Sequence, residues 1–117
     1  RREFIFCGDW AMAHTRNDVE NWHNNDSSSG FLPHEQQWMD QLFTHVGYAD
    51  AFRMGNTDKD EYSYWPSGEV GEGDGWRTDY QIISENLANR VEYATFYKTK
   101  TFSSHLPVII DYDLDVY

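Results

Sequence analysis

A single carboxylate ends an apolar run near the start of the chain. Phe4 to Cys7 are all apolar, and Gly8-Asp9-Trp10 follows them directly. An apolar run bounded by glycine predicts a strand buried on both faces, whose end would carry the Asp9 carboxylate out of the sheet into solvent. An aspartate in that place suits catalysis or metal binding. The alternative is ordinary turn chemistry, in which the carboxylate accepts hydrogen bonds from nearby backbone N–H groups.

Two later stretches each place one chemically useful side chain in or beside a predicted strand. They are Gly75-Trp76-Arg77-Thr78-Asp79-Tyr80 and Phe102-Ser103-Ser104-His105-Leu106-Pro107. Together with Gly8-Asp9-Trp10, and in this order, they resemble the C-terminal half of the exonuclease III/apurinic-apyrimidinic endonuclease family, which has the endonuclease–exonuclease–phosphatase fold. The stretches 13–15, 29–33, 46–53 and 111–113 extend the resemblance over nearly the whole chain. The resemblance implies that residues 1–117 are the C-terminal half of such a domain.

The resemblance implies a role for three of these side chains. The family hydrolyses phosphodiesters with a divalent cation, usually Mg²⁺. Asp9 matches the aspartate of the family's Gly-Asp-X-Asn motif, which positions and deprotonates the attacking water. His105 matches a histidine that faces the scissile phosphate, and Asp79 matches the aspartate that holds it. An aspartate–histidine pair of this kind fixes the imidazole tautomer and raises its basicity, although a buried structural hydrogen bond would look the same in sequence.

Two positions depart from the family pattern. Ala11 stands where the motif has an asparagine that supports the transition state, and alanine has no side-chain donor. Ser104 stands where the family has an aspartate close to the metal, and a hydroxyl is a poorer ligand for a hard divalent ion than a carboxylate. No complete metal site is therefore expected in this chain, and Mg²⁺ binding should be weak or absent. We predict that the chain alone is inactive.

The resemblance also implies a substrate pocket. Tyr64 and Trp76 match aromatic positions that line the pocket for a flipped-out abasic sugar, as in base-flipping enzymes. Arg77 is predicted to contact the substrate beside them. Ordinary aromatic residues at a sheet edge are the alternative interpretation of Tyr64 and Trp76.

Charge argues against tight DNA binding. The chain has 9 Lys and Arg against 20 Asp and Glu, a net charge of −11. Affinity for a nucleic acid backbone comes mainly from neutralising phosphates. The glycine-rich segment 67–75 carries Glu69, Glu72 and Asp74, where family members place residues that grip DNA. We therefore expect DNA to dock poorly on this chain.

The apolar periodicity predicts an α/β layer. Pro33 and a stripe of apolar residues at three- and four-residue spacing predict a helix over about residues 34–46. Ser84 is predicted to cap a short helix that ends at Asn89. Further strands are predicted at 61–65, 76–83, 90–97 and 108–114. The fold class is therefore α/β, a mixed β-sheet layer with helices, resembling the C-terminal half of a four-layer α/β sandwich.

Cys7 is the only cysteine, so an internal disulfide is excluded, and its place in an apolar strand predicts a small core residue. No apolar run is long enough to span a membrane and no signal peptide is visible, so we expect a soluble, intracellular protein. The chain begins without methionine and is expected to be a piece of something longer.

Three functions remain open from the sequence. The leading one is an exonuclease III-like, Mg²⁺-dependent DNA phosphodiesterase half-domain, acting at abasic sites or 3′ ends in DNA repair, with a degraded active site. The second is a catalytically inactive pseudoenzyme that serves as a structural or interaction subunit, or an engineered half-domain. The third is a phosphatase or sugar-phosphate enzyme on the same fold. The expected partner is a second chain that supplies the N-terminal half, or a second copy of this chain.

Overall fold

The computed structural model describes residues 3–25, 27–44, 46–100 and 103–114. Two predicted features, Phe102 of the histidine motif and His45 of the helix, lie outside the described residues. The elements along the chain are β1 (Ile5–Asp9), η1 (Arg16–Asp18), α1 (Trp22–Asn25), α2 (Pro33–Thr44), β2 (Tyr48–Asp50), α3 (Ala51–Gly55), β3 (Asp79–Ser84), η2 (Glu85–Arg90), β4 (Val91–Phe96) and β5 (Val108–Tyr112).

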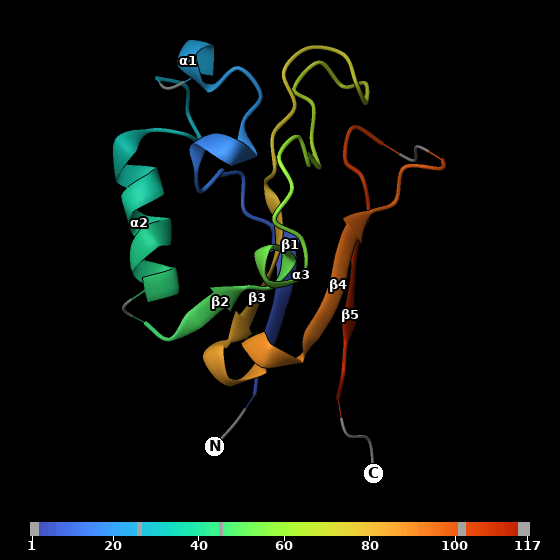
Figure 1. Cartoon of the computed structure of the whole chain (residues 1–117). Coiled ribbons are helices and arrows are strands. Elements are labelled where there is room, and N and C mark those ends of the chain that lie inside the picture. Colours follow the sequence, from blue (N-terminus) through green and yellow to red (C-terminus); the bar gives the residue numbers. More distant parts are fainter. Residues whose placement is uncertain (1–2, 26, 45, 101–102, 115–117) are drawn as a thin grey trace.

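Three strands form one sheet in the order β1-β3-β2. β1 and β3 pair antiparallel, so Ile5 lies opposite Ile83 and Asp9 lies opposite Asp79. The helix α2 lies along one face of this sheet (Figure 1), where its buried Met39 packs with Tyr80 and Ile82 of β3. Leu42 and Phe43 pack in the same cluster, so this part of the predicted apolar stripe joins α2 to the sheet. Trp38 and Val46, the other residues of the stripe, are 46% and 60% exposed.

A second sheet consists of β4 and β5, which pair antiparallel. The short helix α3 packs against β4 and also contacts β3 (Figure 1). Its Ala51 and Phe52 are fully buried, and the Phe52 ring stacks on Phe96 of β4 with the centroids 4.5 Å apart. The start of α3 is therefore buried against β4.

The predicted class of helices on a sheet layer is confirmed, with corrections to individual elements. Every strand pair in the described ranges is antiparallel rather than mixed, because alternation along a strand does not reveal the direction of its partner. Residues 61–65 form no strand: Tyr64 makes only isolated bridges, to Trp76 and to His105. Ser84 does precede η2, but its hydroxyl accepts the Phe4 N–H and does not cap the helix.

The prediction that the first strand is buried on both faces is wrong. β1 is an edge strand of the three-stranded sheet, and all five of its residues are exposed. Phe4, Ile5 and Phe6 are 40%, 41% and 44% exposed, and Cys7 is exposed as well rather than in the core. An apolar run indicates that a strand favours burial. It does not show that other segments of the same chain pack against that strand. β1 is thus an uncovered apolar strand.

The longest helix in the described part of the chain, α2, has 12 residues. Among the described residues, no helix combines the length and apolar character needed to cross a membrane.

Candidate active site

Three of the side chains singled out in the sequence meet at one end of the three-stranded sheet. Asp9 is the last residue of β1 and Asp79 is the first of β3, and the antiparallel register sets them opposite each other. His105 comes from the segment before β5 and makes an isolated bridge to Tyr64, which in turn bridges Trp76, three residues before β3. One ligand atom from each of the three side chains lies within 4.8 Å of the others. Segments from distant parts of the sequence therefore build one polar cluster.

The imidazole of His105 lies between the two carboxylates. Its Nδ1 is 2.7 Å from Asp79 Oδ2, and its Nε2 is 3.6 Å from Asp9 Oδ2. A carboxylate offers only acceptors, so Nδ1 carries the hydrogen that bonds to Asp79. The other ring nitrogen then faces Asp9 and solvent, since the side chains of His105 and Asp9 are 31% and 48% exposed. This arrangement fixes the orientation of the imidazole beside an accessible carboxylate.

Asp9 also has the turn role that was its alternative interpretation. Its Oδ1 accepts the Ala11 N–H at 2.9 Å, which leaves Oδ2 directed toward His105. The two interpretations are therefore compatible, because each uses a different oxygen.

The two degenerate positions lie close to the cluster. Ala11 is exposed and has a φ of 55°, a left-handed conformation that asparagine adopts more readily than alanine. Ser104 is half-buried, and its carbonyl oxygen accepts the Trp65 N–H at 3.2 Å. Neither residue contributes a carboxylate or an amide donor to the cluster.

The cluster alone is a poor fit for Mg²⁺. This ion favours six oxygen ligands in octahedral geometry. Here one oxygen of Asp79 is bonded to His105 and one oxygen of Asp9 is bonded to the Ala11 N–H, and the third group is an imidazole. A site for Mg²⁺ would need further oxygen ligands from elsewhere.

A cavity of about 400 Å³ opens beside the cluster. Its lining includes both predicted aromatic residues, and the remaining wall is formed by Asp9, Ala11, Ser29, Pro66, Thr78 and His105. The Tyr64 ring stacks on the imidazole of His105, with the centroids 4.4 Å apart. Trp76 is only 7% exposed and packs edge-on against Phe31. A role for Tyr64 and Trp76 in binding a substrate stays a prediction.

Arg77 is not available to a substrate in this structure. Its side chain is fully buried, and its guanidinium donates to Asp18 at 2.7 Å and to both oxygens of Asp50, at 3.1 and 2.5 Å. Burial alone would lower the pKa of Arg77, but the charges of Asp50 and Asp18 raise it well above its ordinary value. Arg77 is therefore a structural cation. The sequence carried no sign of its two carboxylate partners, which lie 59 and 27 residues away.

The acidic segment 67–75 is hydrogen-bonded near its C-terminal end to residues in and beside α1. Asp74 accepts hydrogen bonds from the side-chain amides of Asn21 and Asn25, at 2.7 and 3.0 Å. Glu69 and Glu72 are exposed, so their carboxylates face solvent. The negative charge expected from the sequence is thus present on the surface of this segment.

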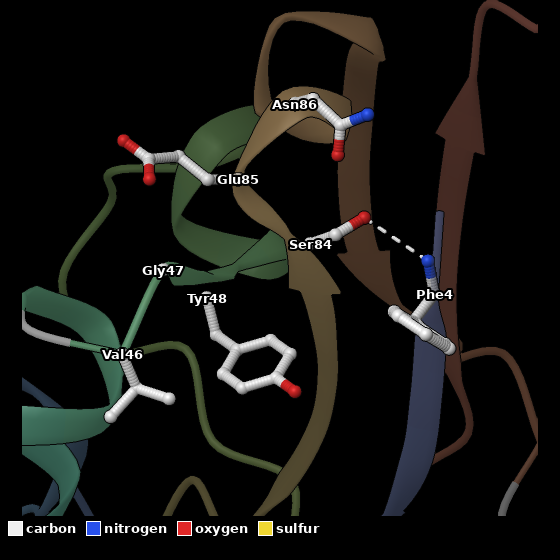
Figure 2. Close-up of a pocket in the computed structure, with 7 residues that line it drawn as sticks. All are labelled: Phe4, Val46, Gly47, Tyr48, Ser84, Glu85 and Asn86. Carbon is white, nitrogen blue, oxygen red and sulfur yellow. Dashed lines mark hydrogen bonds between the residues drawn. The ribbon is translucent and has the colours of Figure 1, made fainter. Parts of the chain in front are cut away.

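A larger cavity, of about 580 Å³, lies away from the cluster, where β1 begins and β3 ends. Figure 2 shows its lining, in which the Ser84 hydroxyl accepts the Phe4 N–H at 3.0 Å. The residues around it are Val46, Gly47, Tyr48, Glu85 and Asn86. None of the predicted site residues reaches this cavity.

The cluster of Asp9, Asp79 and His105 thus lies at one end of a sheet that packs against helices. No family model matches the chain. It is 32% identical over 97% of its length to a DNA-(apurinic or apyrimidinic site) endonuclease of Dictyostelium discoideum, covering 32% of that protein. It is also 32% identical over 92% of its length to an exodeoxyribonuclease of Bacillus subtilis, covering 44% of that protein. The chain thus spans less than half the length of these relatives.

Solved structures give the same result. An AP endonuclease from Leishmania major matches 93% of the chain with a TM-score of 0.75 and 26% identity, and the match covers 35% of that protein. An AP endonuclease from Archaeoglobus fulgidus matches 96% of the chain with a TM-score of 0.84 and covers 46% of that protein, and at 21% identity it supports the fold alone. The chain is related to the exonuclease III/AP endonuclease family.

Proposed function

We propose that this chain is the C-terminal half of an exonuclease III-like DNA phosphodiesterase domain with an incomplete active site. The observation that carries the proposal is the position of His105, 2.7 Å from Asp79 and 3.6 Å from Asp9. The relatives named as exodeoxyribonuclease and as AP endonuclease support it.

Each residue of the cluster would have a distinct role in hydrolysis of a phosphodiester. Asp79 holds the tautomer of His105, whose exposed edge would face the phosphate. Asp9 would orient the attacking water and accept its proton as the new P–O bond forms and the bond to the leaving oxygen breaks. A divalent cation bound with ligands from outside this chain would neutralise the charge on the phosphate. The roles of Asp9, Asp79 and His105 use only side chains that already lie together.

Ala11 and Ser104 would leave this site without two of the groups that support hydrolysis. Removal of one donor that stabilises a transition state typically costs about a hundredfold to a thousandfold in rate. Ala11 offers no side-chain donor, and Ser104 offers a neutral hydroxyl in place of a charge. Together with the poor fit for Mg²⁺, these substitutions favour an inactive chain.

A role as a non-catalytic subunit is the second candidate, and the exposed strand β1 favours it. Phe4, Ile5 and Phe6 are each at least 40% exposed, and large apolar patches on soluble proteins usually mark interfaces. The partner would be a polypeptide that supplies the N-terminal half, or a second copy of this chain. Because two copies would each carry a net charge of −11 and repel each other, a more basic partner should compete well against a second copy, which would cover β1 only when the purified chain has no other partner.

Restoring an asparagine at position 11 and an aspartate at position 104 tests the proposed function. The chain would be produced with the unmatched part of the Bacillus subtilis relative, as wild type and as an Ala11→Asn/Ser104→Asp variant. We expect Mg²⁺-dependent incision of abasic-site DNA only from the variant, and we expect its loss when Asp9→Asn is added. Incision by the restored variant that does not depend on Asp9 would contradict the assigned role. A folded, assembled variant without any incision would favour the non-catalytic subunit.

A further inference from the structure

A buried serine lies between the two segments that carry Asp79 and His105. Ser63 is fully buried, in the stretch 61–65 that forms isolated bridges rather than a strand. It lies in none of the motifs singled out in the sequence. Its position nevertheless gives it contacts to both segments.

The side chain of Ser63 contacts the start of β3. Its Oγ accepts the backbone N–H of Thr78 at 3.1 Å and the backbone N–H of Asp79 at 3.2 Å. These two bonds fix consecutive peptide groups at the point where the Asp79 side chain leaves the backbone. The direction of the Asp79 carboxylate therefore depends on the Ser63 hydroxyl.

The backbone around Ser63 holds the other member of the pair. The carbonyl oxygen of Ser63 accepts the Leu106 N–H at 2.7 Å, and the Trp65 N–H donates to Ser104 at 3.2 Å. His105 lies between these two anchored residues. One residue thus connects the backbone of the histidine segment to the backbone of the aspartate.

We propose that Ser63 is a positioning residue that keeps Asp79 and His105 within hydrogen-bond distance. The separation of 2.7 Å leaves little room, because a shift of about 1 Å would take the pair beyond a hydrogen bond. Loss of the hydroxyl would free the Thr78 and Asp79 N–H groups and leave the backbone contacts to the histidine segment in place. The chemical value of the pair rests on the proposed function, but its geometry can be tested without any activity.

The test uses the imidazole signals of the chain labelled with ¹⁵N-histidine, measured by NMR at pH about 8, above the ordinary titration range of histidine. His105→Gln assigns the signal. Ser63→Cys replaces the hydroxyl oxygen by a weak acceptor with only a small increase in volume, and Ser63→Thr keeps the hydroxyl. Ser84→Ala is the matched control, since this buried serine also accepts a backbone N–H, at the other end of β3 (Figure 2).

The wild type, Ser63→Thr and Ser84→Ala should all show His105 protonated at Nδ1 with the proton shifted downfield by the bond to Asp79. In Ser63→Cys the population of this form should fall at least twofold while the amide spectrum stays folded. An unchanged His105 signal in folded Ser63→Cys would overturn the proposal, as would an equal loss in Ser84→Ala or in Ser63→Thr. Unfolding of Ser63→Cys alone would also overturn it, because it would assign Ser63 to general stability. None of these outcomes depends on catalysis, so the test gives the same answer whether or not the protein is an active enzyme.

Discussion

The buried carboxylate of Asp18 should account for much of the acid sensitivity of this chain. Its Oδ1 accepts hydrogen bonds from Arg77 at 2.7 Å and from Arg53 at 2.6 Å, and its Oδ2 accepts the Thr15 N–H at 3.0 Å. Burial raises the pKa of Asp18, but the two arginines outweigh burial and lower it from 3.8 to about 2. At about 1.4 kcal/mol for each pKa unit, this corresponds to about 2.5 kcal/mol of stability.

The direction of the pKa shift determines how the unfolding free energy changes with pH. A carboxylate whose pKa is lower in the folded chain stabilises the fold fully above its ordinary pKa, and this contribution is lost as the pH falls through the folded value. The wild type should therefore lose about 2 kcal/mol through Asp18 between pH about 5 and pH about 2, and the remainder of the contribution below pH about 2. Asp18→Asn should lack this loss. It should also be less stable at pH 7 by about 3 kcal/mol, because Arg77 would stay buried with one of its carboxylates gone.

Urea unfolding followed by tryptophan fluorescence, repeated from pH 7 down to pH 2, measures both effects. Asp111→Asn is the matched control, because Asp111 is exposed. The difference in unfolding free energy between wild type and Asp18→Asn should shrink steadily as the pH falls, whereas Asp111→Asn should follow the wild type. Equal stability of Asp18→Asn and wild type at pH 7, or parallel curves across the acid range, would refute this account of the network.

Three further predictions concern the surface. Sedimentation of the purified chain at micromolar concentration should show self-association or aggregation, because β1 is uncovered, and a stable monomer that melts cooperatively would speak against an interface there. Duplex DNA should bind with a dissociation constant weaker than micromolar in fluorescence anisotropy at moderate salt, and submicromolar binding with a steep salt dependence would mean that the acidic surface does not govern docking. Cys7 should react with a maleimide within minutes in the folded chain and be protected by a partner that covers β1; a thiol that stays unreactive until urea is added would place β1 in an interior.

The candidate cluster was predictable because its members lie in short motifs. Asp9, Asp79 and His105 each stand in a stretch that resembles the family, and the register of β1 and β3 then brings the two carboxylates together. The helix α2 followed from its apolar spacing and ended two residues before the predicted limit. Local patterns of residues therefore predicted both the helix and the cluster.

Features that depend on distant partners were not predictable in the same way. Arg77 was predicted to contact a substrate because it stands beside Trp76 in a stretch that resembles the family, and only the fold reveals Asp18 and Asp50 around it. Ser63 has no motif, since its importance lies in two backbone groups 15 and 16 residues further along the chain. The exposure of β1 depends on the other strands of the sheet, which an apolar pattern cannot specify.

The most direct test of the proposed function is incision of an abasic-site DNA duplex by the purified chain with Mg²⁺. The proposal predicts no product above the level given by the Asp9→Ala variant, because Ala11 and Ser104 cannot supply the missing groups. Robust turnover by the wild-type chain that is abolished by Asp9→Ala would contradict an incomplete site and would show that Asp9, Asp79 and His105 suffice for the chemistry.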